Sequence, residues 1–493
     1  MRAPDHGVQF PETDGRRSTQ RASVDVFASA VADVDPALGA AISGEREWRK
    51  HYPRHLRAVT ARAAASGEAA SAIARAGLDR LHTTFEVVDG TGAARPLDEA
   101  VAGDPEIELG TRFVAGEADR TTELVVPYRG RELRGDGIVA QAEDWAARGV
   151  VEPSFVDVMR RVVAHPEWLD LTGWSFGLLG AGAEMGPTAH LLSWGAEVAA
   201  VDVPSPRVWE RLGELARAGA GRLAVPTRPD GTDGVDLIAE PAAVRAWLAG
   251  FVPATGPLVL GNYAYADGAD FVRVAMAADT VLVSLQRQRD DVALAYLATP
   301  TDVFAAPPEA VAMSRARQRA ARPLVGVANR VTGGRGFVPN YRLTVTDEAG
   351  RELGIADSLV VQQGPNYALA KRLQRWRALV AHQDGLLSSV HVAPPTRTRS
   401  VTKNRILDAA YAGAHVVEVE PFEPPTSRAV MAALLVHDLR HQAHPDGAAG
   451  GAGETEHDLT AAAAHGGLWR VAWEPRSALP FAVAVGARRL VGL

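Results

Sequence analysis

The chain has 493 residues, of which 47% are hydrophobic and 23% charged, with a formal net charge of −7. This length exceeds one ordinary hydrophobic core, so we expect two or three domains, or one large domain with additions. The negative charge argues against a nucleic-acid partner, and the absence of cysteine excludes disulfides, thiolate metal sites and cysteine nucleophiles.

The sequence contains no apolar run of about eighteen residues, so no membrane-spanning helix is predicted. Residues 1–22 are polar and rich in Arg, Pro and Gly, without the apolar core of a signal peptide. We therefore expect a disordered leader on a cytoplasmic protein that has no membrane partner.

Residues 23–165 are predicted to form a mainly helical N-terminal domain with a few strands. The first part of this segment is rich in alanine and other helix formers, and it contains few helix breakers. No motif in this segment indicates a catalytic or binding function by itself. Shaping a substrate pocket and forming a homo-oligomer both remain open as its role.

Residues 166–440 alternate between apolar runs typical of buried strands and amphipathic runs typical of helices. This alternation predicts an α/β fold, a doubly wound parallel sheet of Rossmann type with helices on both faces. The predicted strands are 175–179, 197–201, 222–225, 257–261, 292–298 and 389–392, and the clearest predicted helices are 240–251, 270–287, 366–381 and 426–439.

An insertion at about 315–357 interrupts the alternation. Its extended runs on either side of Asp347–Gly350 predict a β-hairpin with glycine at the turn. Further on, residues 443–456 contain AAGGAG and are predicted to be a flexible linker. The C-terminal segment, 457–493, includes a strand-like piece at 468–473.

The segment Phe176–Pro187 places three glycines between a predicted strand and a predicted helix. Glycines allow a sharp turn and a close approach to a pyrophosphate, and the first turn of the helix offers unpaired N–H groups. The next predicted strand ends at Asp202, whose carboxylate is suited to accept hydrogen bonds from an adenosine ribose. Together these features indicate a dinucleotide-binding site that includes Gly180, Gly182, Met185 and Gly186.

Tyr367 and Lys371 lie one turn apart on the predicted helix 366–381, away from its apolar stripe. An ammonium beside a phenol lowers the phenol pKa, which makes a better proton donor and acceptor near neutral pH. The alternative interpretation is an ordinary helix surface with a chance Tyr-x-x-x-Lys.

The order of these elements over residues 172–440 resembles that of a divergent short-chain dehydrogenase/reductase. The 180–186 segment is similar to that family's T-G-x-x-x-G-[IL]-G turn, with Leu179 and Glu184 as departures. Tyr367 and Lys371 match the Tyr-x-x-x-Lys pair, although their distance from Thr299 is far longer than the family has. The other similar segments are Val235–Leu237 (strand-end Asp-Val), Leu258–Ala264 (N-N-A-G), Leu294–Thr301 (catalytic-serine strand) and Val390–Thr398 (V-x-x-x-x-P-G-x-x-T, with Pro395 for Gly).

The resemblance implies an NAD(P)-dependent oxidoreductase that transfers a hydride between nicotinamide and a small carbonyl or alcohol substrate. Tyr367 would exchange the proton, Lys371 would hold the nicotinamide ribose, and Thr299 or Thr301 would polarise the carbonyl. Asp202 favours NAD over NADP, whereas Arg207 is placed to reverse that preference. The implied catalytic residues are Tyr367, Lys371, Thr299 and Asn262, and the implied cofactor-binding residues are Gly180, Gly182, Met185, Gly186, Asp202, Asp236, Leu237, Asn262, Lys371, Pro394 and Thr398.

Two alternatives keep the fold and change the function. The departures at Glu184 and Pro395, and the missing serine, are what a non-catalytic nucleotide-binding protein, a redox sensor or scaffold, would show. The second alternative is a protein that binds another adenosine ligand, such as S-adenosylmethionine. No metal site is predicted, because His437, His441 and His444 are interpreted as a solvated helix end.

Overall fold

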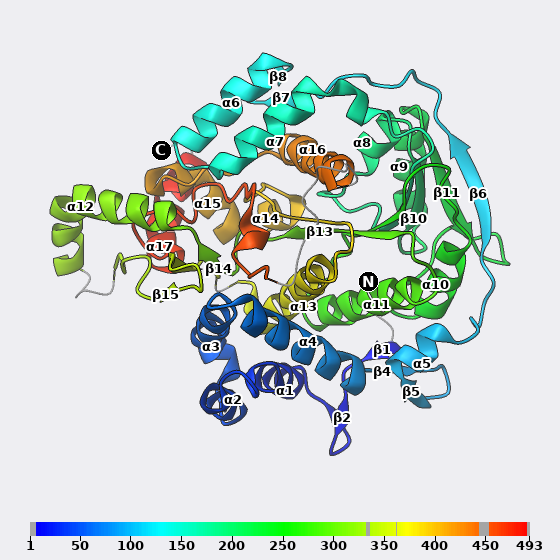
Figure 1. The fold of residues 1–493 in the computed structure, drawn as a ribbon, viewed down its shortest axis with the longest axis horizontal. Helices are drawn as coiled ribbons and strands as arrows, with labels where there is room; N and C mark the ends of the chain where they lie inside the picture. Colours follow the sequence, from blue (N-terminus) through cyan, green and yellow to red (C-terminus); the bar gives the residue numbers. More distant parts are fainter. Residues whose placement is uncertain (1–5, 332–335, 361, 443–452, 491–493) are drawn as a thin grey trace.

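The computed structural model describes residues 6–331, 336–360, 362–442 and 453–490 (Figure 1). Its centre is a sheet of seven strands in the order β17-β13-β12-β9-β10-β11-β6, parallel except for the edge strand β6. From β9 the chain moves outward to β11 and then returns to β12 on the other side of β9. This is the strand order of a doubly wound, Rossmann-like sheet. The strands are β6 (Gly110–Ala115), β9 (Ser175–Leu179), β10 (Glu197–Val201), β11 (Arg222–Thr227), β12 (Leu258–Asn262), β13 (Val292–Ala298) and β17 (Ser388–Val392).

The inner strands form because their residues are apolar on both faces, as parallel sheets require. In β12, Leu258 and Leu260 point into one hydrophobic layer and Val259 into the other, and all three are fully buried. The helices of the first layer are α10 (Pro241–Ala249), α11 (Ala269–Gln286) and α13 (Gly364–Gln383), and those of the second are α8 (Thr188–Ser193), α9 (Pro206–Arg217) and α16 (Pro424–Gln442).

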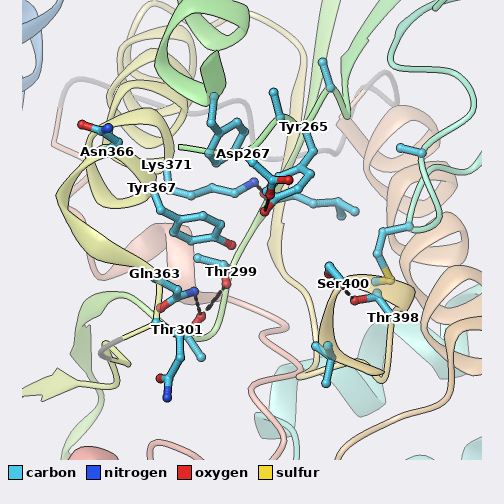
Figure 2. Close-up of a pocket in the computed structure, with 18 of the residues that line it drawn as sticks. Tyr265, Asp267, Thr299, Thr301, Gln363, Asn366, Tyr367, Lys371, Thr398 and Ser400 are labelled. Carbon is cyan, nitrogen blue, oxygen red and sulfur yellow. Dashed lines mark hydrogen bonds between the residues drawn. The ribbon is translucent and has the colours of Figure 1, made fainter. Parts of the chain in front are cut away.

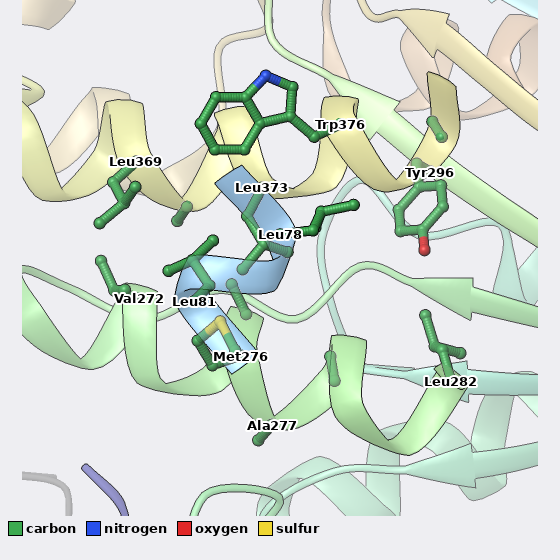
Figure 3. Close-up of a cluster of buried hydrophobic side chains, with 14 of the residues drawn as sticks. Leu78, Leu81, Val272, Met276, Ala277, Leu282, Tyr296, Leu369, Leu373 and Trp376 are labelled. Carbon is green, nitrogen blue, oxygen red and sulfur yellow. The ribbon is translucent and has the colours of Figure 1, made fainter. Parts of the chain in front are cut away.

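The N-terminal helices pack onto the first layer, on α11 and α13 (Figure 1). Figure 3 shows Leu78 and Leu81 between Met276 of α11 and the α13 side chains. The packing is so close that a Cβ at Gly77 would lie 2.3 Å from the Trp376 ring. These helices are α1 (Thr19–Val31), α2 (Pro36–Ser43), α3 (Trp48–Ala63), α4 (Gly67–Thr84) and α5 (Leu97–Ala102).

The predicted disordered leader is wrong for residues 6–22, while residues 1–5 lie outside the described chain. Strand β1 (Gly7–Gln9) pairs antiparallel with β4 (Glu86–Val88), which also pairs with β5 (Ala94–Pro96). Val8 is fully buried, and its carbonyl accepts a hydrogen bond of 2.7 Å from Arg273 Nε on α11. Contacts with β4 and α11 therefore order a segment whose own composition is polar.

The remainder of residues 23–165 covers the second layer. Helix α7 (Pro153–Ala164) packs with α16, and α6 (Asp136–Ala147) packs on α7. Strand β7 (Val126–Tyr128), which forms a hairpin with β8 (Arg131–Leu133), also contacts α16. No helix within the described ranges is long and apolar enough to cross a membrane.

The insertion forms a small sheet beside the main one. Its strands are ordered β14-β16-β15, all antiparallel, with β15 and β16 on either side of the Asp347–Gly350 turn. Because β14 pairs with β16, the chain leaves β13 and returns to α13 at nearly the same place. The elements are β14 (Val303–Ala306), α12 (Pro308–Val331), β15 (Thr344–Thr346) and β16 (Glu352–Asp357).

Helix α17 (Pro475–Leu490) of the C-terminal segment crosses α15 (Arg405–Gly413) at very short range. A Cβ at Gly413 would lie 1.9 Å from the carbonyl oxygen of Ala482, so only glycine fits there. The predicted strand at 468–473 is wrong: these residues form turns, with one isolated bridge from Trp473 to Pro339. Of the predicted linker, residues 443–452 lie outside the described chain, whereas Glu456 is 2% exposed and fixed by ion pairs.

Candidate functional site

A single cavity of about 1660 Å³ lies at the carboxyl ends of β9, β10, β12 and β13, where the strand order reverses. Ligands of doubly wound sheets bind at this point. Of the predicted site residues, Gly186 alone does not line the cavity. Those that line it are Gly180, Gly182, Met185, Asp202, Asp236, Leu237, Asn262, Thr299, Tyr367, Lys371, Pro394 and Thr398.

The glycine turn after β9 is closely packed. Gly180 has φ +79°, and a Cβ there would lie 2.6 Å from the backbone nitrogen of Ala264. The Gly182 amide donates to the Asp202 carboxylate at 2.8 Å, and the Arg211 guanidinium donates to the Gly182 carbonyl. Both glycines are therefore required by the fold of the turn itself.

The helix expected directly after this turn is delayed. Helix α8 begins only at Thr188, after Gly186 and Pro187, and it has six residues. The helix N-terminus therefore does not reach Gly182, contrary to the prediction. Among the amides of the turn, those of Glu184 and Met185 have no partner within the described residues and remain available to a phosphate.

The acid at the end of β10 is largely withdrawn from solvent. Burial raises the pKa of Asp202, although the amides of Gly182 and Val203 act in the opposite direction. The Asp202 carbonyl also accepts a hydrogen bond of 3.0 Å from the Val235 amide. This bond brings the 235–240 loop to the same end of the cavity. Asp236 lies in this loop rather than at a strand end, because β11 already ends at Thr227.

Asn262 stands at the end of β12 with one polar group unpartnered. Its Oδ1 accepts a hydrogen bond of 3.3 Å from the Ala264 amide. Its Nδ2 is buried and has no hydrogen-bond partner within the described ranges. A buried orphan donor is costly unless something binds it, so this amide marks a place where a ligand acceptor fits.

The insertion brings Thr299 and Tyr367 together despite their long separation in sequence (Figure 2). Thr299 Oγ1 lies 2.9 Å from Thr301 Oγ1, and Gln363 donates to Thr301. Burial raises the pKa of Tyr367 to about 12, although hydrogen bonds with Thr299 and Gln363 act to lower it. The phenol is therefore protonated at neutral pH, and the expected lowering of its pKa does not occur in this state.

Lys371 is directed away from the Tyr367 hydroxyl. Its Nζ donates to the Leu297 carbonyl at 3.1 Å and to Gln374 Oε1 at 3.0 Å. Burial lowers the pKa of Lys371 to about 8, because neither partner carries a negative charge and Asp302 only partly offsets the burial. The lysine is thus a partly desolvated cation in the cavity wall.

Lys371→Met is expected to stabilise the protein by about 1–3 kcal/mol at pH 7, because it removes this burial cost. Below pH 8 the lysine is charged in the folded and the unfolded chain, and the cost is fully present. Between about 8 and the ordinary value of 10.5, only the unfolded chain keeps the proton, so wild-type stability rises relative to the variant. Urea unfolding of both proteins at pH 7 and pH 10 measures the difference in their free energies of unfolding. An equal difference at the two pH values would contradict the prediction.

Two residues that line the cavity were not among the predicted site residues. Glu184 accepts a hydrogen bond of 2.8 Å from the Arg399 amide and so ties the glycine turn to α14 (Arg399–Lys403). This contact accounts for a glutamate where the family pattern has glycine. Tyr411, on α15, lines the cavity, and burial raises the pKa of its phenol. No motif in the sequence signals it.

The interpretation of the α16 histidines as a solvated helix end is wrong for His437, which is buried. His437 Nδ1 lies 3.1 Å from Asp438, whose other oxygen lies 2.6 Å from His391 Nε2. His444 falls outside the described chain. Within the described residues no group of three or more His, Cys, Asp or Glu side chains is placed to hold a metal ion.

No protein-family model matches the sequence, and no curated protein matches it. Among solved structures, the chain is similar to a thiolation-reductase di-domain from an archaeal non-ribosomal peptide synthetase, with 11% identity and a TM-score of 0.29. The match spans 57% of this chain and 62% of that chain. A likeness at this TM-score carries no conclusion about function, which has to come from the cavity.

Proposed function

We propose that the protein is an NAD(P)-dependent oxidoreductase that acts on a carbonyl compound or the corresponding alcohol. The observation that carries this proposal is the single cavity. At one end it has the Gly180 turn and Asp202, and at the other it has Thr299, Tyr367 and Lys371. One extended dinucleotide would touch both ends.

The residues at the first end fit such a cofactor. The amides of Glu184 and Met185 would face the pyrophosphate, and Asp202 would accept from the adenosine ribose. Asp202 would repel a 2′-phosphate, and Arg207 is absent from the cavity lining, which favours NAD over NADP. The bound cofactor would supply the hydride.

The residues at the second end would handle the proton. Tyr367 would donate its phenolic proton to the substrate oxygen, since its raised pKa keeps it protonated at neutral pH. Thr299 would hold the phenol in place and donate a hydrogen bond to the same oxygen. Lys371 would bind a ribose hydroxyl, and the free Nδ2 of Asn262 would bind a further acceptor of the nicotinamide half.

Gly182→Asp is expected to weaken NADH binding by at least about 100-fold. The new Cβ would lie 2.9 Å from an Asp202 carboxylate oxygen, so the aspartate would bring a second negative charge into the phosphate end. Titration of the protein with NADH and NADPH, followed by reduced-nicotinamide fluorescence, measures the loss and the preference between the cofactors.

The matched control is Gly90→Asp, because a Cβ at Gly90 meets nothing within 4 Å and Gly90 is not among the residues that line the cavity. Its affinity for NADH should equal that of the wild type. No binding of either nucleotide by the wild type would refute the oxidoreductase proposal and favour another adenosine ligand. Binding without turnover of any carbonyl compound would favour the non-catalytic alternative.

A further inference from the structure

The cavity continues beyond Tyr367 into what we call the apolar arm. Its walls come from α15, the short turn that follows it, α17 and the chain leading into α17. They include Leu407, Ala410, Val417, Val471, Leu479 and Ala482. From Ala393 onward, none of the described residues that line the cavity is charged. The charged lining residues, such as Asp202 and Arg228, belong to earlier segments. The charged lining residues and the uncharged walls of the arm therefore come from different parts of the chain.

The cavity is larger than one ligand needs. Small-molecule sites usually measure about 300–1,000 Å³, whereas this cavity measures about 1660 Å³. A cofactor between the glycine turn and Lys371 therefore leaves space for a second molecule.

The apolar arm begins at the reactive end of the cavity. Tyr411 of α15 lines the same cavity as Tyr367. Among the described residues no side chain forms a hydrogen bond with the Tyr411 hydroxyl, which leaves it free to donate to a ligand in the cavity. A carbonyl group held there would direct the rest of its molecule along the arm.

The walls of the arm are rigid. Helices α15 and α17 touch through backbone atoms, since a Cβ at Gly413 or Gly486 would come within 2 Å of a carbonyl oxygen of the other helix (1.9 Å and 1.8 Å). Helices in such contact cannot approach further to close the space between their outer side chains. The arm therefore remains available to a ligand.

We propose that the apolar arm binds the hydrocarbon body of an uncharged carbonyl compound, or its alcohol, with the reacting oxygen at Tyr367. This substrate class rests on the proposed oxidoreductase function. A carboxylate or phosphate at the far end of the substrate would lose its hydration without meeting an opposite charge, so such substrates are excluded. Burial of each methylene supplies binding free energy instead.

The first experiment tests the arm without the cofactor. Nile red, a neutral dye that fluoresces in apolar surroundings, should bind the wild type and be displaced by decan-1-ol. Leu479→Asp, which places a charge in the arm, should weaken dye binding at least tenfold. Phe481→Asp, two residues further along α17, changes an exposed side chain outside the cavity lining and should bind the dye like the wild type. Equal binding by all three proteins would overturn the inference.

The second experiment needs no variant, so misfolding of Leu479→Asp cannot obscure the result. With NADH as reductant, kcat/KM for straight-chain aldehydes from butanal to decanal should rise about fourfold per methylene until the arm is filled. A ten-carbon aldehyde that ends in a carboxylate should be at least 100-fold poorer than decanal. Independence of chain length, or equal use of the charged aldehyde, would overturn the inference.

The two proposals fail in different ways. If NADH does not bind, the oxidoreductase proposal fails while the dye displacement still judges the arm. If NADH binds and short or charged carbonyl compounds are reduced equally well, the oxidoreductase proposal stands and the apolar substrate class falls.

Discussion

Replacing Tyr367 by phenylalanine is expected to lower kcat about 1,000-fold while the affinity for NADH changes less than about twofold. The phenol forms a hydrogen bond with Thr299 at the reacting end and is the proposed proton donor, and general-acid catalysis contributes about 10²–10⁴-fold. The ring itself packs on Phe271, with centroids 5.3 Å apart, and phenylalanine preserves this contact. Steady-state kinetics with decanal, together with fluorescence titration of NADH, separates the two effects.

The matched control is Tyr265→Phe. Tyr265 also lines the cavity, but it is 54% exposed and its hydroxyl donates to Asp267 at 2.9 Å. We expect its kcat to stay within about threefold of the wild type. If both variants lose activity equally, or if Tyr367→Phe retains it, the assignment of the proton donor is wrong.

Glu456→Gln is expected to lower the free energy of unfolding by about 3–5 kcal/mol. Its carboxylate bonds Arg372 at 2.7 Å and Arg375 at 3.0 Å, and all three side chains are at most 4% exposed. Asp302 is the second carboxylate of the cluster, 2.9 Å from Arg375. With a neutral glutamine, two buried guanidinium groups would share a single negative charge.

Urea unfolding measures this loss, and Glu454→Gln is its control. Glu454 pairs with His382, but its side chain is 24% exposed, so its loss should cost less than about 1 kcal/mol. Because Arg372 and Arg375 lie on α13, the cluster fixes the helix that carries Tyr367 and Lys371. A cost below about 1 kcal/mol for Glu456→Gln would show that the cluster does not hold this helix.

The central sheet was predictable because its strands are short apolar runs buried on both faces. The predicted bounds of β9, β10 and β13 match those observed. The leader was mispredicted because the burial of β1 depends on β4 and Arg273, which are distant in sequence. The start of α8 was mispredicted because Gly186 and Pro187 delay it, an effect that the glycine spacing alone does not reveal.

All the predicted site residues except Gly186 line one cavity. Many of them follow the carboxyl ends of parallel strands, which meet at one edge of the sheet, and α13 brings Tyr367 and Lys371 to the same edge. The electrostatics did not follow from the motif. The pKa values of Tyr367 and Lys371 depend on burial by the surrounding segments, and burial moves them in directions that their spacing does not indicate. Tyr411 and the apolar arm depend on the crossing of α15 with α17, a contact between segments far apart in the chain.

The edge strand β6 joins the N-terminal third of the chain to the central sheet. It pairs antiparallel with the whole of β11, from Arg222 to Thr227, yet it belongs to the N-terminal third of the chain. A shortened protein that began after α7 would present the bare edge of β11, a template for intermolecular pairing and aggregation. The part of the chain that carries the cavity is therefore not an independent folding unit. Recombination or truncation that separates it from residues 110–115 would replace an internal strand pair by association between molecules.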